Sequence, residues 1–385
     1  MRKTKLKNLK VEINKALKEQ GYKLKSNGFV LGNSNRSTKR SVHKLAKIER
    51  IIAHKDFIIK TSKLAKKYLI DGKNLKIEKI NPKIIEVKSG TKWEDLFKWW
   101  NLVWWSLPYE HAYGRQMRFI IWDQYHKAPI GLIGLQSPIL SWSVRDNYLN
   151  ISWKNRDYWV NQSLSAQRLG ALPPYNYILG GKLVAYLMAT DGIRKKFRNK
   201  YKNQKTIMKE RELPARLLFI TTTGAYGKSS VYTRLKFNDE YIARFIGYTK
   251  GAGSFHIPNS LFEKLVSYLK QKKHNVKRGF GNGPSRKLRL IDQSLELLGF
   301  KNGAIHGVQR AVYLFPFAKN LQDVIQKNTR PKWEHRKVED ITTFWKERWA
   351  LNRVKKDGTY LKFKGKNFVN YEMRKLRECV KLKGN

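Results

Sequence analysis

The sequence has little cysteine, few acidic residues and no long apolar runs. A single cysteine, Cys379, excludes an internal disulfide and any metal site built from several thiolates. No run approaches the roughly 18 apolar residues of a membrane-spanning helix, and the opening MRKTKLKNLK leads into no apolar stretch typical of a secretory signal. We therefore expect a cytoplasmic protein without a membrane partner.

Acidic residues are scarce relative to basic ones. The 385 residues include 29 Asp and Glu against 80 Lys and Arg, a formal net charge of +51 at pH 7. Solubility of a small domain needs a net charge of only about 2–8. Lys and Arg side chains that neutralise phosphates release counterions, so this surplus predicts a nucleic-acid partner rather than an anionic membrane. A general lysine bias of the proteome is the alternative explanation.

The charge is unevenly distributed along the chain. Residues 1–90 hold 25 Lys and Arg against 7 Asp and Glu, whereas residues 91–180 hold 9 against 6. Together with the hydrophobic patterns, this predicts a basic helical N-terminal region (1–90), a mixed α/β core (91–258) and a basic helical C-terminal region (259–385). A unit bounded by a linker should be separable, so we expect a chain without residues 1–85 to stay folded.

Both basic regions carry helical patterns. Leu9, Ile13 and Leu17 recur at a four-residue step, a second helix is expected at about 42–51, and Thr61–Ser62 could cap a third. These helices form either a helix-turn-helix or a basic appendage that contacts no bases. Near the other end, two amphipathic helices are expected, with the caps at Asn259 and Ser285.

The middle of the chain alternates between strand and helix patterns. The runs RFIIWD, PIGLIGLQSPIL, AQRLGALPP and ARLLFITTT predict strands, as do the shorter DNYLNIS, VYTRLKF and YIARFIGYTK, whereas YNYILGGKLVAYLMATDG predicts a helix. Five tryptophans in WEDLFKWWNLVWWSLP predict a packed helix face, with base stacking as the alternative. The expected fold class is α/β (α+β), a mixed curved sheet with flanking helices.

Two loops concentrate residues that bind phosphate. The run IGYTKGAGSFHIP combines a lysine and hydroxyls with glycines that allow close approach of the backbone, but it lacks P-loop spacing. It is either a clamp for phosphates or a plain β-turn, and GKSSVYTRLKF offers a second basic loop after a strand. The candidate nucleic-acid or phosphate-binding residues are Lys228, Arg234, Thr249, Lys250, Gly251, Gly253 and His256.

A pair of glycines lies near an expected helix start after a strand. The N–H groups and dipole of such a start bind phosphate, and in N-acyltransferase folds the pyrophosphate of acyl-coenzyme A rests at a strand-to-helix loop. We therefore consider an N-acyltransferase-like core with acyl-coenzyme A as cofactor, held by Arg168, Gly180 and Gly181. Close packing of helix on sheet is the alternative role of these glycines.

The scarce carboxylates limit metal chemistry. A two-metal nuclease needs acids that converge on one site, and Glu110, Asp123, Asp146 and Asp157 show no D…ExK spacing. Glu110–His111 is not followed by a histidine at helical spacing, which excludes a zinc-protease motif. A metal-dependent nuclease is thus disfavoured, no metal site is expected, and no catalytic residue can be assigned.

Several blocks stand in a distinctive order and spacing over about residues 85–350. They are YGRQMRFIIWDQYHKAPIGLIGLQSPI, Arg145–Asp146, QRLGALPPYNYILGGKL, FIGYTKGAG and HGVQRAVYLFPFAKN. By their order and spacing, these blocks resemble the DruA family of the Druantia anti-phage systems. The resemblance implies phage resistance within a multi-gene system that has a large helicase-like partner. Related shorter proteins beside transposase-like genes are compatible with DNA as ligand, but the family implies no catalytic mechanism.

Three functions remain open at this point. The first is a nucleic-acid-binding component of a DruA-like anti-phage defence system, supported by the charge of +51. The second is an N-acyltransferase-like enzyme that modifies nucleic acid, supported by Gly180 and Gly181. The third is a mobile-element-associated DNA-processing protein.

Overall fold

The computed structural model describes residues 2–25, 28–32, 35–105, 107, 114–206, 209–277 and 285–384. The helices are α1 (Arg2–Glu19), α2 (Arg36–Ser41), α3 (Lys44–Ala53), α4 (Lys55–Lys67), α5 (Lys92–Val103), α6 (Ser143–Tyr148), α7 (Arg156–Val160), α8 (Gly180–Met188), α9 (Asp191–Tyr201), α10 (Asn259–Gln271), α11 (Arg286–Leu297), α12 (Leu321–Lys327), α13 (Val338–Trp345), α14 (Leu351–Lys356) and α15 (Gly365–Gly384). Within these ranges, no helix combines the length and the apolar character needed to cross a membrane.

The strands are β1 (Tyr22–Lys25), β2 (Gly28–Leu31), β3 (Pro82–Glu86), β4 (Gln116–Asp123), β5 (Ala128–Gln136), β6 (Ser163–Ala171), β7 (Phe219–Thr223), β8 (Lys236–Phe237), β9 (Glu240–Tyr241), β10 (Arg244–Tyr248) and β11 (Ala311–Pro316). Short 3₁₀ turns lie at η1 (Gly72–Asn74), η2 (Ile77–Lys79), η3 (Tyr175–Ile178) and η5 (Thr359–Lys362), and a π-helical turn, η4 (Lys346–Ala350), joins α13 to α14.

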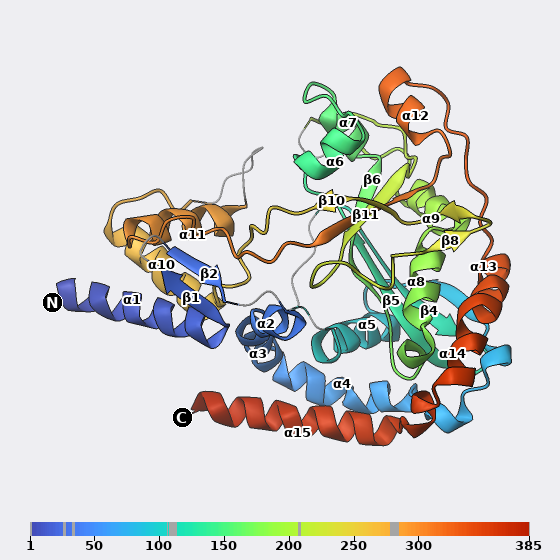
Figure 1. The fold of residues 1–385 in the computed structure, drawn as a ribbon, viewed down its shortest axis with the longest axis horizontal. Helices are drawn as coiled ribbons and strands as arrows, with labels where there is room; N and C mark the ends of the chain where they lie inside the picture. The colour runs from blue at the N-terminus through green and yellow to red at the C-terminus, as the bar shows by residue number, and fades with distance from the viewer. Residues whose placement is uncertain are drawn as a thin grey trace.

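A seven-stranded sheet forms the body of the molecule, in the order β10-β11-β7-β6-β5-β4-β3 (Figure 1). All neighbouring strands are antiparallel except β6 and β7, which are parallel and are connected through α8 and α9. The mixed sheet with flanking helices that the sequence predicts is therefore confirmed.

The centre of the sheet is covered on both faces, which explains the nearly continuous apolar sequence of β5. Ile133 belongs to the hydrophobic cluster shared with α8, whereas the adjacent Leu132 belongs to the cluster shared with α5. A Cβ at Gly131 would lie 2.4 Å from Cγ2 of Val184 in α8. Glycine at this position therefore allows the helix to approach the sheet closely.

The two parallel strands pair over only part of their length. Ser163 to Ala166 of β6 lie opposite Phe219 to Thr222 of β7, and beyond that point β6 continues to Ala171 along β5 alone. The sheet is thus open between β6 and β7 beyond Ala166.

A smaller lobe combines segments from distant parts of the sequence. In Figure 1, α1 and the β1–β2 hairpin lie beside α10 and α11. Ile13 and Leu17 of α1 share one buried cluster with Leu265 and Leu269 of α10. The lobe is therefore held together by contacts between the expected N-terminal and C-terminal regions.

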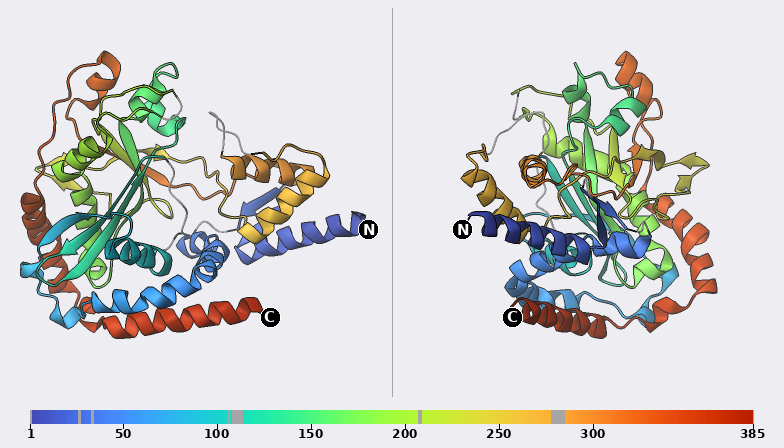
Figure 2. Two further views of the ribbon diagram at one scale, coloured as in Figure 1. Left: turned by 180° about the vertical axis from the view of Figure 1, so that it is seen from behind. Right: turned by 60° about the vertical axis from the view of Figure 1, so that its left-hand side comes forward.

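Long helices also bring the two ends of the chain together under the sheet. Helix α15 runs along α4 (Figure 2), and α4 packs against α5. Nε1 of Trp99 donates to the carbonyl of Ile58 at 3.2 Å, and Phe368 of α15 stacks on Trp100 with ring centroids 5.6 Å apart. This part of the tryptophan-rich segment is thus a packed helix face. The region boundaries near residues 90 and 258 remain predictions, and described contacts cross both of them.

Some sequence-predicted elements differ from the structure. The run DNYLNIS is not a strand, because the buried Arg145 and Asp146 hold its first half in α6. Thr61 is not a cap but lies buried in the middle of α4, and Pro258 occupies the position before α10 that was expected for Asn259. Ser285 does cap α11, since its side chain accepts from the Leu288 N–H at 3.3 Å. Short polar patterns were the least reliable guide.

Candidate nucleic-acid interface

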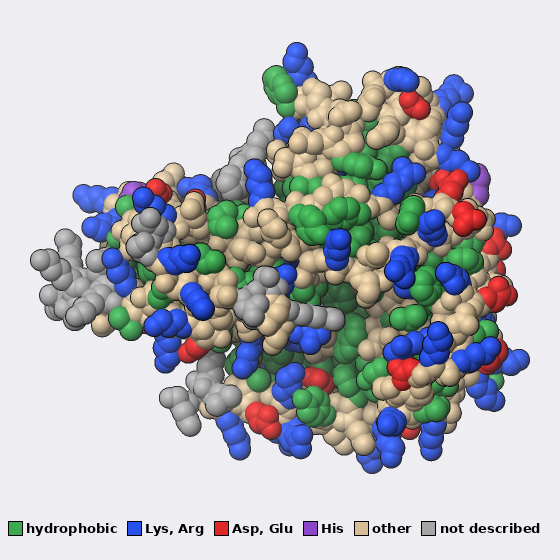
Figure 3. Space-filling view, viewed as in Figure 1, with side chains coloured by type: hydrophobic (Ala, Val, Ile, Leu, Met, Phe, Trp, Pro, Cys, Tyr) green, Lys and Arg blue, Asp and Glu red, His purple; other side chains and the backbone are tan. Residues whose placement is uncertain are grey.

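A cavity of about 1750 Å³ opens where β6 and β7 part. Its walls come from the end of β6, the end of α5, the start of α8, the turn between α2 and α3, the loops 225–232 and 249–255, and the segment before β11. Figure 3 shows a hollow near the middle of this face, with hydrophobic side chains on its floor and Lys and Arg side chains around it. The hollow lies between the small lobe and the sheet.

The charges around the cavity have one sign. Among the lining residues that the structure describes, there is no Asp or Glu but there are six Lys and Arg side chains, Arg40, Arg168, Lys182, Lys228, Lys250 and Arg310. An anionic ligand here meets cations and no competing carboxylate within the described wall. Low-dielectric walls of a cleft also concentrate the field of such charges.

Hydrogen bonds fix the backbone of the glycine-rich loop on both sides of Lys250. Thr249 donates its N–H to the carbonyl of Arg310 at 2.9 Å, and the Arg310 N–H donates to Oγ1 of Thr249 at 3.1 Å. Gly251 has a positive φ of 73°, and its carbonyl accepts from the N–H groups of His306 and Gly307. This conformation favours glycine and leaves the exposed Lys250 side chain on the cavity wall.

A second lysine ties α8 to the neighbouring loop. Nζ of Lys182 donates to the carbonyls of Ser230, Val231 and Thr233 at 2.9, 3.2 and 3.2 Å. Burial and the positive charge of Arg234 lower the pKa of Lys182 to about 8. Lys182 thus fixes the loop that carries Lys228 and adds charge to the wall.

Aromatic and basic side chains alternate at the end of the cavity next to the small lobe. The ring of His43 lies 4.1 Å from that of Phe255, and Phe255 lies 4.1 Å from His306. The Arg310 guanidinium covers Phe255 at 5.0 Å, and Arg40 covers Tyr226 at 5.8 Å. Each cation therefore stands beside a flat apolar surface.

The structure brings together most of the residues that the sequence singled out. Lys228, Thr249, Lys250, Gly253, Arg168 and Gly181 all line this cavity. Arg234, Gly251 and Gly180 are not among its lining residues: Gly251 and Gly180 each adjoin lining residues in the chain, and Arg234 follows the lining residue Tyr232 by two positions. His256 is fully buried in the small lobe, where Nε2 lies 2.9 Å from the carbonyl of Gly303.

Five basic or histidine side chains of the wall carry no sequence signal that singles them out, Arg40, His43, Lys182, His306 and Arg310. Arg40 and His43 come from the N-terminal region, Lys182 from helix α8 of the core, and His306 and Arg310 from the expected C-terminal region. No local spacing links them, because only the folded chain brings these three regions together.

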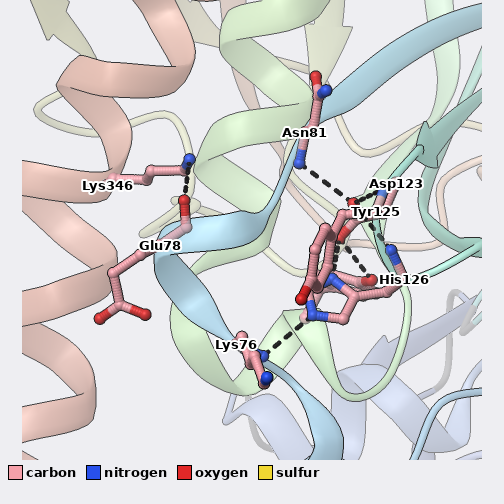
Figure 4. Close-up of polar contacts among 8 residues, drawn as sticks. Lys76, Glu78, Asn81, Asp123, Tyr125, His126 and Lys346 are labelled. Atoms are coloured by element: carbon pink, nitrogen blue, oxygen red, sulfur yellow. Dashed lines mark hydrogen bonds and ion pairs between the residues drawn. The ribbon is translucent and has the colours of Figure 1, made fainter.

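The carboxylates considered for metal chemistry lie outside this cavity. Asp123 accepts from the N–H groups of Asn81 and Tyr125, both at 3.1 Å, and its Oδ2 lies 2.6 Å from Nδ1 of His126 (Figure 4). Asp146 pairs with Arg145 and Asp157 with Lys209, whereas Glu110 and His111 lie outside the described residues. Within the described chain, no group of three or more His, Cys, Asp and Glu side chains could hold a metal ion.

The fold and the cavity define a basic mixed α/β protein with a large recess, whose charged side chains within the described wall are all Lys or Arg. A family model described as Druantia protein DruA matches residues 33–327. A Druantia protein DruA of Escherichia coli (strain UMEA 4076-1) is 34% identical over 370 residues, which cover 94% of this chain and 91% of the relative. The chain therefore belongs to the DruA family. None of the solved structures matches it.

Proposed function

We propose that this chain is the nucleic-acid-binding component of an anti-phage defence system and that its ligand is DNA. The observation that carries the proposal is the cavity wall, in which six Lys and Arg and no described Asp or Glu surround a large hollow. Such a wall attracts phosphates through counterion release and supplies direct contacts. Membership of the DruA family supports the role in defence.

The proposal includes other proteins of the same system. The family resemblance implies a large helicase-like partner, and a helicase would supply or move the DNA that this chain binds. We propose that the two act together in the cytoplasm. Co-purification from phage-infected cells tests whether the chain associates with other proteins of the system. An association that is lost on nuclease treatment is bridged by DNA, whereas one that is retained reflects direct contact between the proteins.

Reversal of the charge at Lys250 tests the cavity as the DNA site. We expect Lys250→Glu to weaken DNA binding about tenfold or more, because a charge-assisted contact is lost and a repulsive one replaces it. The matched control is Lys66→Glu, the same charge change on an exposed turn of α4 away from the cavity. Fluorescence-anisotropy titrations at several salt concentrations measure both affinities and their salt slopes.

The two variants also distinguish phosphate contacts in the cavity from a general attraction of DNA to the basic surface. Each phosphate neutralised adds about −0.9 to the slope of log K against log salt on duplex DNA. A wild-type affinity that does not change with salt would contradict the whole electrostatic account. Equal losses for Lys250→Glu and Lys66→Glu would place the DNA on the general basic surface instead.

A second function is favoured by one specific observation. Gly181, the second residue of α8, lines the cavity at the point where β6 gives way to that helix, and Arg168 of β6 lines it as well. The parted strands β6 and β7 leave space beside this helix start for an extended ligand, so acyl-coenzyme A could place its pyrophosphate on the first turn of α8. The chain would then be an N-acyltransferase-like enzyme acting on nucleic acid.

A thermal-shift titration tests this second function. If acetyl-coenzyme A binds, saturation at about 100 times Kd should stabilise the protein by about 2.7 kcal/mol, and Gly181→Asp should abolish the stabilisation through repulsion of the pyrophosphate. The control is Gly192→Asp, which changes the second residue of the neighbouring helix α9, outside the cavity. No shift in the wild-type protein, or equal shifts in both variants, would contradict an acyl-coenzyme A site at α8.

A further inference from the structure

The cavity is larger than a site for one small ligand. Its volume of about 1750 Å³ exceeds the roughly 300–1,000 Å³ of typical small-molecule pockets. It is also a recess rather than a flat face, so a ligand must enter it between the small lobe and the sheet (Figure 3). A flexible, elongated ligand that carries several anionic groups suits this shape.

Three aromatic side chains line this recess without a role in the core. Trp105, Trp142 and Tyr226 are half-buried and belong to none of the four hydrophobic clusters in the described part of the chain. The Trp105 ring packs beside Gly170 of β6, where a Cβ would lie 3.1 Å from it, and the Tyr226 ring lies 6.1 Å from that of His43. The exposed part of each of the three rings offers a large apolar surface to a flat group of the ligand.

Two cations lie over aromatic rings of the recess wall. Arg40 lies over Tyr226 at 5.8 Å, and Nζ of Lys182 lies over the ring of Trp349 at 4.3 Å. Flat rings interleaved with cations match a ligand in which flat bases alternate with phosphates. In a duplex, neighbouring bases cover each base face, whereas an unpaired strand presents its base faces for stacking on aromatic side chains.

We propose that the recess binds an unpaired stretch of DNA, with bases stacked on Trp105, Trp142 and Tyr226 and phosphates on the surrounding Lys and Arg. This inference rests on the proposed DNA-binding function and names its substrate class as single-stranded rather than duplex DNA. A single strand arises wherever a duplex is opened or resected, so the site suits an end, a gap or an unwound segment. Backbone contacts from the basic surface add affinity for either form.

Anisotropy titrations with two probes test the proposal. One probe is a labelled oligothymidylate of about 20 nucleotides, a length that spans the site sizes of single-strand-binding folds. The other probe is the same strand annealed to its complement. We expect the full chain to bind the single strand at least about fivefold tighter than the duplex at equal salt. This factor corresponds to the lower end of the affinity that one stacked base contributes. Trp142→Ala and Trp105→Ala should each weaken single-strand binding roughly 5- to 150-fold and leave duplex binding nearly unchanged.

Trp153→Ala serves as the matched control. Trp153 is 73% exposed and lies outside the recess, so its loss should change neither affinity. Equal affinity for both probes with no effect of Trp105 or Trp142 would overturn the single-strand inference but leave DNA binding intact. Failure of both probes to bind would overturn the proposed function itself, and circular dichroism melts of each variant show that an observed loss is not unfolding.

Discussion

A chain that begins at residue 86 is expected to aggregate instead of folding, contrary to the separable core that the composition predicts. Within the described part of residues 1–85, eleven hydrophobic side chains are buried. Burial of a Val, Leu, Ile or Phe side chain, as most of them are, is worth about 1.5–3 kcal/mol. Their combined contribution is thus comparable to or larger than the about 5–15 kcal/mol that stabilises a typical domain.

The truncation also exposes apolar side chains that residues 1–85 cover in the full chain, and this exposed surface favours aggregation. Without α4, the fully buried Trp99 loses its contact at Ile58, and without α1, Leu265 and Leu269 of α10 lose theirs. Removal of most of β3 also exposes the edge of β4 as a template for intermolecular pairing.

Expression of 86–385 alone, followed by size-exclusion chromatography and a thermal melt, measures this outcome. Coexpression of 1–85 as a separate chain is the control and should restore solubility. A soluble 86–385 fragment with a cooperative melt would contradict the packing argument.

The central sheet could be predicted from the sequence because burial on both faces leaves a strong local signal. The runs RFIIWD and PIGLIGLQSPIL became β4 and β5, and ARLLFITTT contains β7. The helix expected from Tyr175 to Gly192 is broken at Leu179, whose φ of 61° separates η3 from α8. In VYTRLKF only Lys236–Phe237 is extended, and these two residues form β8.

The cavity could be predicted only in part, because its wall is made of residues far apart in the sequence. Lys228 and Lys250 were found because glycines and hydroxyls surround them, a local pattern typical of phosphate-binding loops. Arg40 and Arg310 carry no such pattern. They lie 270 positions apart in the sequence and meet in the cavity wall only in the folded protein. His256 was selected by its neighbours in a loop, but hydrophobic packing with Tyr22 and Phe29 places it in the core.

Acidification from pH 7 to pH 5 is expected to destabilise the junction between the small lobe and the sheet. His43 and His306 are buried at this junction and His256 in the small lobe behind it, each with at most 3% of its surface exposed. Burial lowers the pKa of His43 and of His306 to about 3 and that of His256 to about 4, with Arg310 adding to the shift at His43. All three are therefore neutral in the folded protein at pH 5.

The sign of the effect follows from proton linkage. In the unfolded chain a histidine has a pKa of about 6.5, so below that pH the unfolded state binds protons that the folded state does not. Stability then rises with pH between about 4 and 6.5 and is lost as the pH falls through this window. Each of the three histidines costs about 2 kcal/mol at pH 5 relative to neutral pH.

The carboxyl groups with shifted pKa values do not imitate this loss. The Gly90 N–H and Arg118 lower the pKa of Glu94, so its stabilisation is complete above the ordinary carboxyl pKa of about 4.3 and fades only below it. Burial raises the pKa of Glu334 and of Glu372, and a group with a raised pKa in the folded state stabilises the protein as the pH falls. A net loss of stability between pH 6.5 and 5 therefore reports on the histidines.

Urea unfolding at pH 5, 6 and 7.5 measures the effect. The wild-type free energy of unfolding should fall by several kcal/mol, about 2 for each of the three histidines, between pH 7.5 and pH 5. His43→Gln removes one proton site from the unfolded chain, so its curve should be flatter by about 2 kcal/mol over the same interval. The comparison variant is His335→Gln, whose side chain is 77% exposed and should keep the wild-type slope. A His43→Gln curve parallel to the wild-type curve would show that His43 already takes up its proton in the folded protein, which would place it in contact with solvent at the cavity wall.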